Sequence, residues 1–579
     1  MNSQSTRFFA DMRISILAVV FSLLVGLQSN AQITSAPNFS NLRAMAEWEE
    51  LQALTISWTG FPAILKQIVA AARMETQVII LSDDVQGTED YLLTQNAGGA
   101  AFANFDNILI VDSNYDSIWM RDYAANPVYG NEVDSLILVD WLYNRDRPND
   151  DTSPAYVADA LNLDLYETSN PPYDLVNTGG NYMSDGFGTA FASELILDEN
   201  DGNGDYNIFY PNHTTQEVNT ILETFMGIQT YIKMPTLPFD GIHHIDMHMK
   251  LVDEETLLVS EYPQGVADGP QINANINYVL SNYTSKFGTP FRVVRIPAPP
   301  QQQGSNYPDE GGDYLTYTNA VFVNNTIIIP TYREEYDTTA LRIWSEVCPG
   351  YNLVGIDCDN TSNNIIAQSG AIHCITQSVG VADPLLISHQ PLNDTYDAIN
   401  PYLVSAYMRH RSGVERATLY WRLQGSSSFS TVDMIANEND WEAFIPAQAV
   451  GSVVEYYVEG ESTSGKIQVR PMPAPIGFWS FSVLGEINNI REISSTVINR
   501  VYPNPASAIT CIEINSQHAQ EATIRLIDIA GREVYTVHRG NLKSGESHFF
   551  FNAEQFESGV YQVTVETSVG VKATPIMIN

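Results

Sequence analysis

Cysteine and basic side chains are scarce in this sequence, and each shortage excludes a class of protein. Four cysteines in 579 residues are too few for a disulfide scaffold, although Cys348 and Cys358 are close enough along the chain to pair in an oxidising compartment. Lys and Arg number 28 against 68 Asp and Glu, so the formal net charge at pH 7 is −40. That charge argues against a nucleic-acid ligand and attracts cationic ligands.

Long hydrophobic runs are also scarce, and the one candidate lies at the start of the chain. Ile14–Leu27 is a compact apolar run preceded by Arg7 and Arg13 and followed by a small-residue cleavage site at Ser29–Ala31. This pattern predicts a signal peptide over residues 1–31. The run is short for a membrane-spanning helix, so we expect an exported mature chain without a transmembrane segment. For such a chain, the acidic surface chiefly serves solubility.

The length exceeds what a single hydrophobic core supports and predicts two to four domains. Within residues 32–384, helical stretches such as Gly60–Met74 alternate with short buried runs, which is typical of an α/β domain. The strands expected in this domain are Gln77–Leu81, Asn107–Val111, Ser135–Val139, Thr256–Val259, Val321–Ile329 and Tyr351–Ile356.

An acidic insertion at Asp198–Asp205 interrupts the α/β pattern. Its carboxylates and glycines resemble a calcium loop, with Asp198, Asp201 and Asp205 as candidate ligands of a structural cation. The loop lacks the terminal Glu at the expected place. A solvated turn therefore explains the composition about equally well.

From about Leu385 the chain changes to short alternating strands. Their length and spacing predict an immunoglobulin-like β-sandwich over residues 385–488, which we interpret as a spacer or docking module because no chemistry stands out there. The strands expected in it are Leu403–Arg409, Ala417–Leu423, Trp441–Ile445, Val453–Glu459 and Phe478–Val483. Residues 489–579 form a third, small all-β unit.

Four stretches of the α/β domain concentrate polar residues in apolar surroundings, and the first is Trp119–Tyr123. Arg121 and Asp122 are adjacent, so on a strand or loop their side chains point in different directions. Asp122 can then face a pocket while Arg121 pairs elsewhere. A surface loop with a charge pair is the competing interpretation.

The second stretch is Gly241–Leu251. If it forms a strand, His244, Asp246 and His248 share one face. Such a row can bind zinc or iron, and it can equally supply an acid–base His beside a carboxylate. A histidine satisfied within the core is the third possibility. The spacing slightly favours a metal because three potential ligands align.

The remaining two stretches contain Asn319 and Cys374. Asn319 leads into an apolar strand, where Asn is commonly a turn or cap residue. Cys374 follows the small residues Ser369–Ala371 on a tight turn, where a thiol can be exposed and a neighbouring cation can hold it as thiolate. The plain alternative is a small buried hydrophobic residue.

Together these stretches resemble the guanidine-modifying, or pentein, superfamily, and within it the agmatine deiminases and the Porphyromonas-type peptidylarginine deiminases. The resemblance covers roughly the whole α/β domain. The motifs that carry it are Trp119–Asp122, Gly179–Gly186, His244–Asp246, Asn319 and His373–Thr376. It implies a pseudo-fivefold α/β propeller with a central site that works without a cofactor or a catalytic metal.

The resemblance also implies roles for individual residues. Cys374 is expected to be the nucleophile and His244 the acid–base, while Asp122 and Asp246 grip the guanidinium. Asn319 matches a site position of the peptidyl type, and we include Trp119 among the substrate-binding residues. The implied reaction is hydrolysis of a guanidinium to a ureido product and ammonia through a covalent cysteine adduct.

For the substrate, the stretch Trp141–Pro148 resembles the peptidyl type, in which paired arginines hold the carboxylate of a C-terminal arginine. Arg145 and Arg147 match that pattern, with Asp146 between them. Agmatine has no carboxylate, so an arginine-containing peptide is the favoured substrate over a small guanidino compound. For the function, the alternatives are an agmatine deiminase, an amidinotransferase and an inactive guanidine-binding surface module. For Arg145 and Arg147, the alternative is a basic loop paired with its own aspartates.

Two departures from the family pattern affect these expectations. Tyr123–Asn126 stands where the family usually has Gly-Pro, so the loop beside Asp122 is expected to differ. Thr178 precedes Gly179 where agmatine deiminases usually carry an acidic residue, which again favours the peptidyl type.

The C-terminal unit resembles the sorting domain of the type IX secretion system. The four matching motifs are Val501–Pro505, Ile527–Arg532, Gly559–Val563 and Val571–Thr574, in that order. The resemblance implies the type IX machinery as a partner, and a protein that is exported across the outer membrane to be secreted or held at the cell surface.

Overall fold

The computed structural model describes residues 32–203, 211–301, 314–485, 496–528, 531–567 and 570–579. The expected signal peptide and Asp205 lie outside these residues. Two compact units are present: residues up to 392 with 401–446 and 454–480, and residues 393–400, 447–453 and 481–579. No helix among the described residues has both the length and the apolar character needed to cross a membrane.

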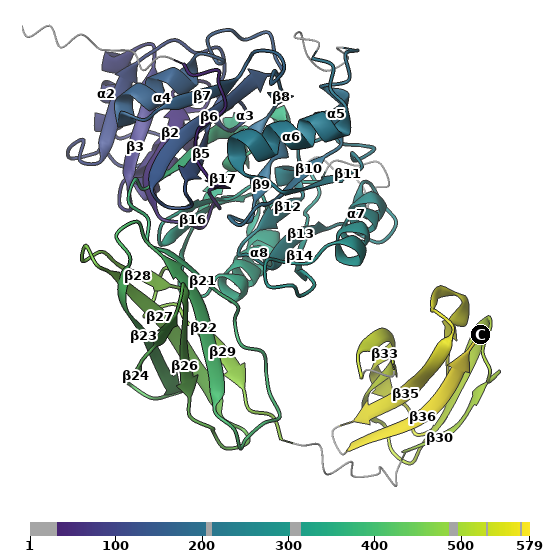
Figure 1. The fold of residues 1–579 in the computed structure, drawn as a ribbon. Coiled ribbons are helices and arrows are strands. Elements are labelled where there is room, and N and C mark those ends of the chain that lie inside the picture. Colours follow the sequence, from purple (N-terminus) through teal and green to yellow (C-terminus); the bar gives the residue numbers. More distant parts are fainter. Residues whose placement is uncertain (1–31, 204–210, 302–313, 486–495, 529–530, 568–569) are drawn as a thin grey trace, which may run out of the picture. The chain divides into compact units, whose positions relative to one another are not determined.

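Five small sheets, built on one pattern, make up most of the first unit (Figure 1). In each sheet a short entry strand pairs antiparallel with a second strand, which pairs in parallel with a third. A helix joins the second strand to the third. The entry strands are β5 (Asn126–Gly130), β9 (Met183–Ser184), β12 (Met249–Leu251), β15 (Val321–Val323) and β20 (Gln377–Gly380).

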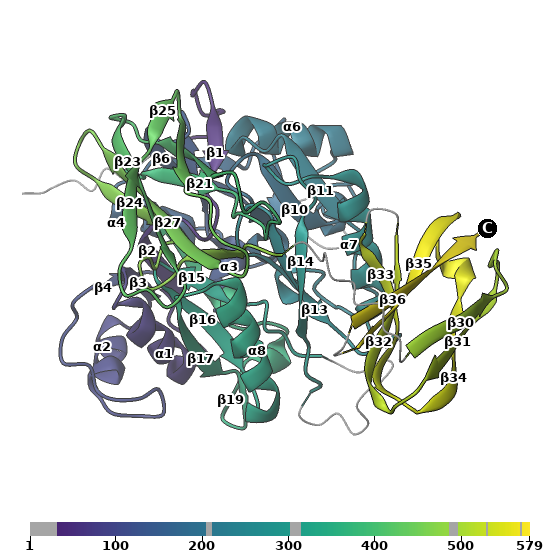
Figure 2. The ribbon, with the colours of Figure 1, turned by 90° about the horizontal axis from the view of Figure 1, so that it is seen from below.

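The pairs that follow the entry strands are β6 (Ser135–Tyr143) and β7 (Leu165–Thr168), β10 (Thr189–Ser193) and β11 (Thr230–Met234), β13 (Thr256–Glu261) and β14 (Arg292–Pro297), β16 (Thr326–Thr331) and β17 (Asn352–Asp357), and β2 (Leu51–Ser57) and β3 (Gln77–Ser82). The helices that join them are α4 (Ser153–Leu161), α6 (Thr215–Met226), α7 (Gly269–Asn282), α8 (Glu334–Val347) and α1 (Pro62–Ala72). Figure 2 shows α1, α6 and α7 toward the periphery and the short α3 (Met120–Tyr123) nearer the middle.

Smaller elements complete these sheets. They are β1 (Leu42–Ala44) beside β5, β4 (Ile108–Asp112) beside β3, β8 (Val176–Asn177) beside β6, the pair β18 (Asp359–Asn360) and β19 (Asn363–Asn364), and the helices α2 (Val85–Leu93) and α5 (Leu195–Asp198). The α/β character expected from the alternating sequence is confirmed.

Local sequence explains where the helices begin and end. In α6, the Thr214 hydroxyl accepts from the Glu217 backbone N–H, and the Glu217 carboxylate accepts from the Thr214 N–H, which forms a capping box. The helix ends at Gly227, whose φ of 72° suits glycine. Helix α1 begins with Pro62, where a missing N–H costs nothing.

One expected strand is wrong in detail. Val321–Ile329 is not a single strand but a hairpin of β15 and β16, with Asn324 at the turn. Asn324 has a φ of 50°, a left-handed conformation that Asn tolerates better than most residues. The sequence pattern does not reveal this turn, because its two Asn residues lie within an otherwise apolar run.

The disulfide that closeness along the chain allowed between Cys348 and Cys358 does not form, since both thiols are free and buried. Cys348 ends α8, just before β17, and Cys358 directly follows β17. A six-residue strand spans about 20 Å, far beyond the reach of a disulfide. Closeness along the chain was misleading because an extended strand separates the two residues.

Two antiparallel sheets follow the α/β part. One has the order β21-β22-β26-β25 and the other β24-β23-β27-β28. Their strands, with β29 after them, are β21 (Leu386–His389), β22 (Tyr402–Arg409), β23 (Val414–Leu423), β24 (Ser430–Asp433), β25 (Ile435–Asn437), β26 (Asp440–Ile445), β27 (Val453–Ser462), β28 (Ile467–Arg470) and β29 (Trp479–Ser482). These sheets bond to the α/β part: Tyr407 donates to Glu132 at 2.8 Å, and Arg470 to the Trp48 carbonyl at 2.9 Å.

The C-terminal part is all β, as expected. Its two antiparallel sheets have the orders β30-β31-β34 and β33-β32-β35-β36 and share a core that includes Ile512, Leu526 and Val563. The strands are β30 (Thr496–Tyr502), β31 (Ile509–Ser516), β32 (Gln520–Ile527), β33 (Glu533–Leu542), β34 (Gly545–Asn552), β35 (Gly559–Thr567) and β36 (Gly570–Ile578).

Candidate active site

Each of the five α/β sheets carries a polar segment just before its entry strand, and these segments meet. Helix α3 contacts the 3-10 turns η1 and η4, and η1 contacts η2. The five segments are α3 before β5, η1 (Gly179–Asn181) before β9, η2 (Ile245–Met247) before β12, Thr318–Asn319 before β15, and η4 (His373–Ile375) before β20. The fold therefore gathers Asp122, Gly180, Asp246, Asn319 and Cys374 from five parts of the chain.

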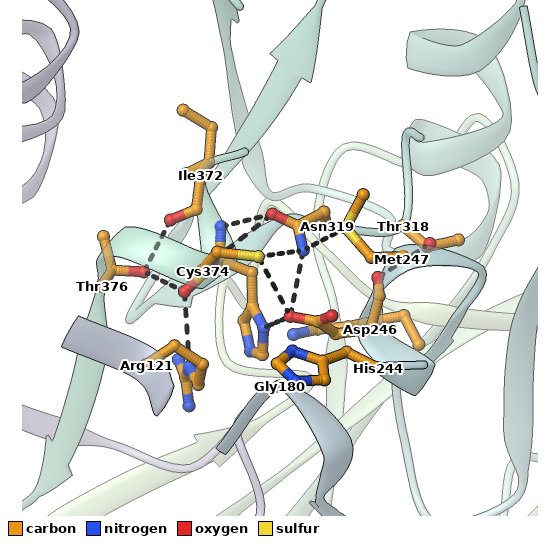
Figure 3. A network of polar contacts seen from close by, with 12 residues as sticks. Arg121, Gly180, His244, Asp246, Met247, Thr318, Asn319, Ile372, Cys374 and Thr376 are labelled. Carbon is orange, nitrogen blue, oxygen red and sulfur yellow. Dashed lines mark hydrogen bonds and ion pairs between the residues drawn. The ribbon is translucent and has the colours of Figure 1, made fainter. Parts of the chain in front are cut away.

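Cys374 is 2% exposed and forms one corner of a buried polar cluster (Figure 3). The Asn319 amide Nδ2 lies 3.1 Å from Cys374 Sγ and 3.0 Å from Asp246 Oδ2. The Asn319 Oδ1 accepts from the backbone N–H of His373 at 3.0 Å. Sγ lies 3.6 Å from Asp246 Oδ2. Asn319 thus fixes the distance between sulfur and carboxylate.

His244 and Asp122 form a second pair beside the first. His244 Nδ1 lies 3.5 Å from Asp122 Oδ1, and Nε2 lies 3.0 Å from the Thr178 hydroxyl. Asp122 Oδ1 also accepts from the Gly180 N–H at 3.3 Å. Gly180 has no room for a side chain: an added Cβ would lie 2.5 Å from His244 Nδ1 (Figure 3). The glycine allows the backbone and the imidazole to approach closely.

A buried charge network supports the cluster from behind. His373, fully buried, places Nδ1 2.7 Å from Asp246 Oδ2 and Nε2 2.8 Å from Glu47 Oε1. Both ring nitrogens of His373 therefore have a carboxylate partner. Glu47 also pairs with Lys250 and lies 3.8 Å from Arg121 Nη1. Because His373 precedes Cys374, this network fixes both the turn that carries Cys374 and the carboxylate of Asp246.

The electrostatics differ from those expected for a thiolate held by a neighbouring cation. Burial, then the charges of Asp246 and Asp122, raise the pKa of the Cys374 thiol well above its usual range. Burial also raises the pKa of Asp122. The pKa of Asp246 is lowered: burial acts upward, but the hydrogen bond and charge of His373 outweigh it. The site therefore holds a thiol facing acidic groups, and a bound cation would favour the thiolate.

The structure places the other expected site residues as follows. Arg121 and Asp122 are both buried and point apart, since Arg121 Nε donates to the His373 carbonyl at 3.4 Å. The indole of Trp119 lies against Gly370, where an added Cβ would meet it at 2.3 Å. Arg145 is exposed, yet its charge acts on Asp122. Arg147 is partly buried and donates to the Tyr143 hydroxyl at 3.0 Å.

The strand that would align His244, Asp246 and His248 on one face does not form. His244 precedes the 3-10 turn η2, which has about three residues per turn, so the period-two alignment of His244, Asp246 and His248 does not form. His248 lies in the wall of a cavity that Cys374 does not line. Among the described residues, potential metal ligands gather within 4.8 Å of one another only at Glu513, Glu546 and His548. The metal interpretation of this row is therefore not supported.

The acidic insertion is described only in part. Asp201 accepts from the backbone N–H of Asn203 at 2.8 Å and from its side chain at 2.6 Å, and Asp198 ends α5. Because Asp205 lies outside the described residues, the proposed cation at Asp198, Asp201 and Asp205 stays a prediction.

Sequence reasoning missed two acidic residues beside the site. Glu47 stands in the run Glu47–Glu50, and its acidic neighbours in sequence give no sign of a buried partner. Glu199 sits in the acidic insertion, yet it is 1% exposed and accepts from Asn144 Nδ2 at 2.5 Å. Burial raises the pKa of Glu199 to about 7, although the hydrogen bond from Asn144 and the charges of His244 and Arg145 partly offset that rise. Only burial distinguishes these residues from surface acids.

Five sheet-and-helix repeats around a buried cysteine, an imidazole and two carboxylates define the guanidine-modifying class of α/β propellers. The particular family is given by the sequence: residues 43–379 match the family described as Porphyromonas-type peptidyl-arginine deiminase, which is more than half of the chain. The chain belongs to this family. It is a hydrolase that acts on C–N bonds of amidines and deiminates a guanidine group.

The chain is similar to curated relatives in sequence and to solved structures in fold. A putative agmatine deiminase of Mycoplasma mycoides is 23% identical over 298 residues, covering 47% of this chain and 77% of the relative. One of a Marinomonas strain is 22% identical and covers 60% of this chain and 97% of the relative. The solved agmatine deiminase of Enterococcus faecalis has a TM-score of 0.50 at 18% identity and covers 60% and 99% of the two chains.

The C-terminal resemblance is also confirmed. Residues 500–579 match the family described as secretion system C-terminal sorting domain. The protein is therefore exported through the type IX system and is secreted or held at the cell surface.

Proposed function

We propose that the protein deiminates arginine in peptides, with C-terminal arginine favoured, and releases a citrulline residue and ammonia. The observation that carries this proposal is the cluster in which Cys374, Asp246 and the His244–Asp122 pair meet in one buried site. A guanidinium is flat and cationic, so two carboxylates can hold its N–H groups in one plane with the central carbon facing the sulfur.

The first half of the reaction forms a covalent adduct. The bound cation offsets the charges of Asp122 and Asp246, which lowers the pKa of the Cys374 thiol from its raised value in the free site. The thiol proton passes to His244 as the sulfur attacks the central carbon. His244 returns that proton to one nitrogen, the carbon–nitrogen bond breaks, and ammonia leaves behind a cationic thiouronium.

The second half hydrolyses the adduct. His244 takes a proton from water as the oxygen attacks the thiouronium carbon. The carbon–sulfur bond then breaks, the sulfur regains a proton from His244, and the ureido product forms. The one net proton leaves with ammonia as ammonium. His244 performs both transfers, so the position of its ring matters in each.

The substrate preference rests on the two arginines after β6. Arg145 is exposed and its charge reaches Asp122, so a ligand between Asp122 and Asp246 lies within its field. A guanidinium fork binds a carboxylate with two parallel hydrogen bonds. We propose that Arg145 and Arg147 bind the terminal carboxylate of the substrate and that Trp119 contacts its side chain. Thr178, in place of an acidic residue, supports the peptidyl type.

For the remaining chain we propose the expected domain organisation. Residues 32–384 form the catalytic domain, 385–488 an immunoglobulin-like sandwich that acts as a spacer or docking module, and 489–579 the sorting domain. The two antiparallel sheets and their direct bonds to the catalytic part support the sandwich assignment.

The test compares three substrates with the full-length protein: peptides ending in Arg, peptides with internal Arg, and agmatine. We expect citrulline and ammonia chiefly from the first, and a covalent adduct on Cys374 in acid-quenched samples analysed by mass spectrometry. Cys374→Ala should abolish turnover, while Cys511→Ala, at a buried thiol of the sorting domain, should leave it unchanged. Activity retained by Cys374→Ala would contradict the nucleophile assignment.

A second candidate is agmatine hydrolysis, which the named agmatine deiminase relatives favour. Faster turnover of agmatine than of any peptide would select it. If Arg145→Ala and Arg147→Ala turn over the peptides as fast as the wild-type protein does, these arginines do not bind the terminal carboxylate. An amine acceptor that raises turnover would indicate amidino transfer, and substrate binding without any turnover would indicate an inactive binding module.

A further inference from the structure

A cavity lies beside the proposed active site. It has a volume of about 180 Å³, and its lining includes Asp240, His248, Tyr262, Asp268 and Tyr314. We call it the Asp240 cavity. It is the place where His248 lies, a residue that the sequence singled out and that the reaction does not use.

The Asp240 cavity and the reacting sulfur share one wall. Met247 lines the cavity, and its sulfur lies 3.5 Å from the Asn319 Nδ2 that is also 3.1 Å from Cys374 Sγ. Ser369, also in the lining, lies on the loop that leads to Cys374. Consecutive Cα atoms of a peptide are 3.8 Å apart, so a long side chain on the residue before the bound arginine can lie beside the arginine side chain and enter this cavity.

The cavity is acidic. Neither Lys nor Arg occurs among its described lining residues. Burial raises the pKa of Asp268, and the charge of Asp240 adds to that rise, so the two carboxyl groups repel each other. Burial lowers the pKa of His248 to about 4, which leaves its imidazole neutral at physiological pH. A cation entering the cavity would relieve the repulsion.

Two residues of this lining carry buried polar atoms without a partner among the described residues. His248 is only 4% exposed, and within the described part of the chain its Nδ1 has no hydrogen-bond partner. The same holds for Asp240 Oδ2, whereas Asp240 Oδ1 accepts from the Ile242 N–H at 3.0 Å. Buried polar atoms are normally bonded, so these two point to a ligand that supplies the partner.

The aromatic lining favours an organic cation over a metal ion. The rings of Tyr262 and Tyr314 stack with centroids 4.6 Å apart and planes 23° apart. Aromatic faces attract ammonium and guanidinium groups, and carboxylates bind them with charge-assisted hydrogen bonds. Asp240, His248 and Asp268 are not among the described residues whose ligand atoms gather within 4.8 Å of one another.

We propose that the Asp240 cavity is a second cation subsite, which binds the Lys or Arg side chain of the residue that precedes the reacting C-terminal arginine. The inference rests on the proposed function, because it assumes an arginine peptide at Cys374. It makes the protein selective for peptides that end in two basic residues.

The experiment compares full-length protein on three peptides of equal length ending in Lys-Arg, norleucine-Arg and Glu-Arg. Norleucine keeps the length of the lysine chain and removes its charge. We expect kcat/KM for Lys-Arg to exceed that for norleucine-Arg by about tenfold, as befits one charge-assisted hydrogen bond, with Glu-Arg the poorest. Equal values for Lys-Arg and norleucine-Arg would overturn the proposal.

Asp240→Asn tests the residue itself, since it can keep the Oδ1 acceptor for Ile242 and removes the charge. We expect it to abolish the preference for Lys-Arg while the norleucine-Arg rate stays within twofold. Asp90→Asn, at an exposed position of α2, is the matched control and should keep the preference. A preference that survives in Asp240→Asn would refute the assignment of the subsite to Asp240.

Calorimetry separates the failure of this inference from failure of the proposed function. The full-length Cys374→Ala variant is titrated with the Lys-Arg and norleucine-Arg peptides, with and without Asp240→Asn. If no citrulline forms from any peptide, the proposed function fails, yet tenfold tighter binding of Lys-Arg that requires Asp240 still supports a cation subsite. Equal affinities would reject the subsite whatever the activity.

Discussion

Substitution of Gly180 by alanine is a sharp test of the site geometry, because it adds only one methyl group and the site has no room for it. An alanine Cβ at this position would lie 2.5 Å from His244 Nδ1 and 3.1 Å from Asp122 Oδ1. Non-bonded heavy atoms clash at less than about 3.5 Å, so the imidazole ring of His244 must move away by roughly 1 Å. Thr178 holds the other ring nitrogen at 3.0 Å, which opposes that retreat.

We expect Gly180→Ala to lower kcat/KM for a peptide ending in Arg by about 100-fold, the usual consequence of misplacing a catalytic group by roughly 1 Å. The same overpacking should cost about 1–3 kcal/mol of unfolding free energy, which leaves the protein folded at 25 °C. The assays are citrulline formation under steady-state conditions and thermal unfolding followed by circular dichroism.

The matched control is Gly559→Ala, because an added Cβ there meets its nearest neighbour, Tyr561, at an ordinary 3.7 Å. It should change neither the rate nor the unfolding temperature of the catalytic part. Wild-type kcat/KM in Gly180→Ala would refute the argument, since it would mean that the His244–Asp122 pair can move without loss.

Three further changes probe the polar surroundings of the site. Thr178→Val keeps the side-chain shape but removes the hydroxyl bound to His244. We expect kcat/KM to fall about fivefold, which corresponds to the loss of one neutral hydrogen bond. An unchanged kcat/KM would show that Thr178 does not position His244. Glu47→Gln leaves Lys250 buried without its carboxylate and should lower the unfolding free energy at pH 7 by about 3–5 kcal/mol in urea titrations. The pKa of Glu47 lies well below its usual range, so the ionised Glu47 side chain stabilises the fold above about pH 4.5 and loses this effect on acidification. The difference in unfolding free energy between wild type and Glu47→Gln should therefore shrink toward pH 3. A difference that stays constant with pH would contradict the charge network. Burial raises the pKa of Glu199 to about 7, so the folded protein loses stability as the pH rises from about 4.5 through 7 and the buried carboxyl group must ionise. Glu199→Gln, which stays neutral, should therefore be more stable than wild type by about 3 kcal/mol at pH 8 and similar to it at pH 5. Equal stability of the two proteins at both pH values would show that Glu199 is not a buried acid.

The amino-acid sequence was sufficient for the features that depend on local pattern. Alternating helical and buried runs indicated the α/β domain, and the motifs around His244, Asn319 and Cys374 indicated the class of chemistry. Local pattern failed where a regular period was assumed over a turn, as at His248 and within Val321–Ile329. It failed again for Cys348, because closeness in sequence says nothing about the direction of the intervening strand.

The tertiary structure alone decided which acids belong to the site and what state the thiol adopts. His373 and Glu47 are 326 residues apart in sequence yet share a hydrogen bond, and nothing local to Glu47 marks it as a partner. The pKa values of Cys374 and Glu199 rise because surrounding chain excludes water, a property of packing that a sequence does not display. The sequence gives the chemical type of each side chain, but burial and the pairing of distant charges arise only when the five sheets close around a common centre.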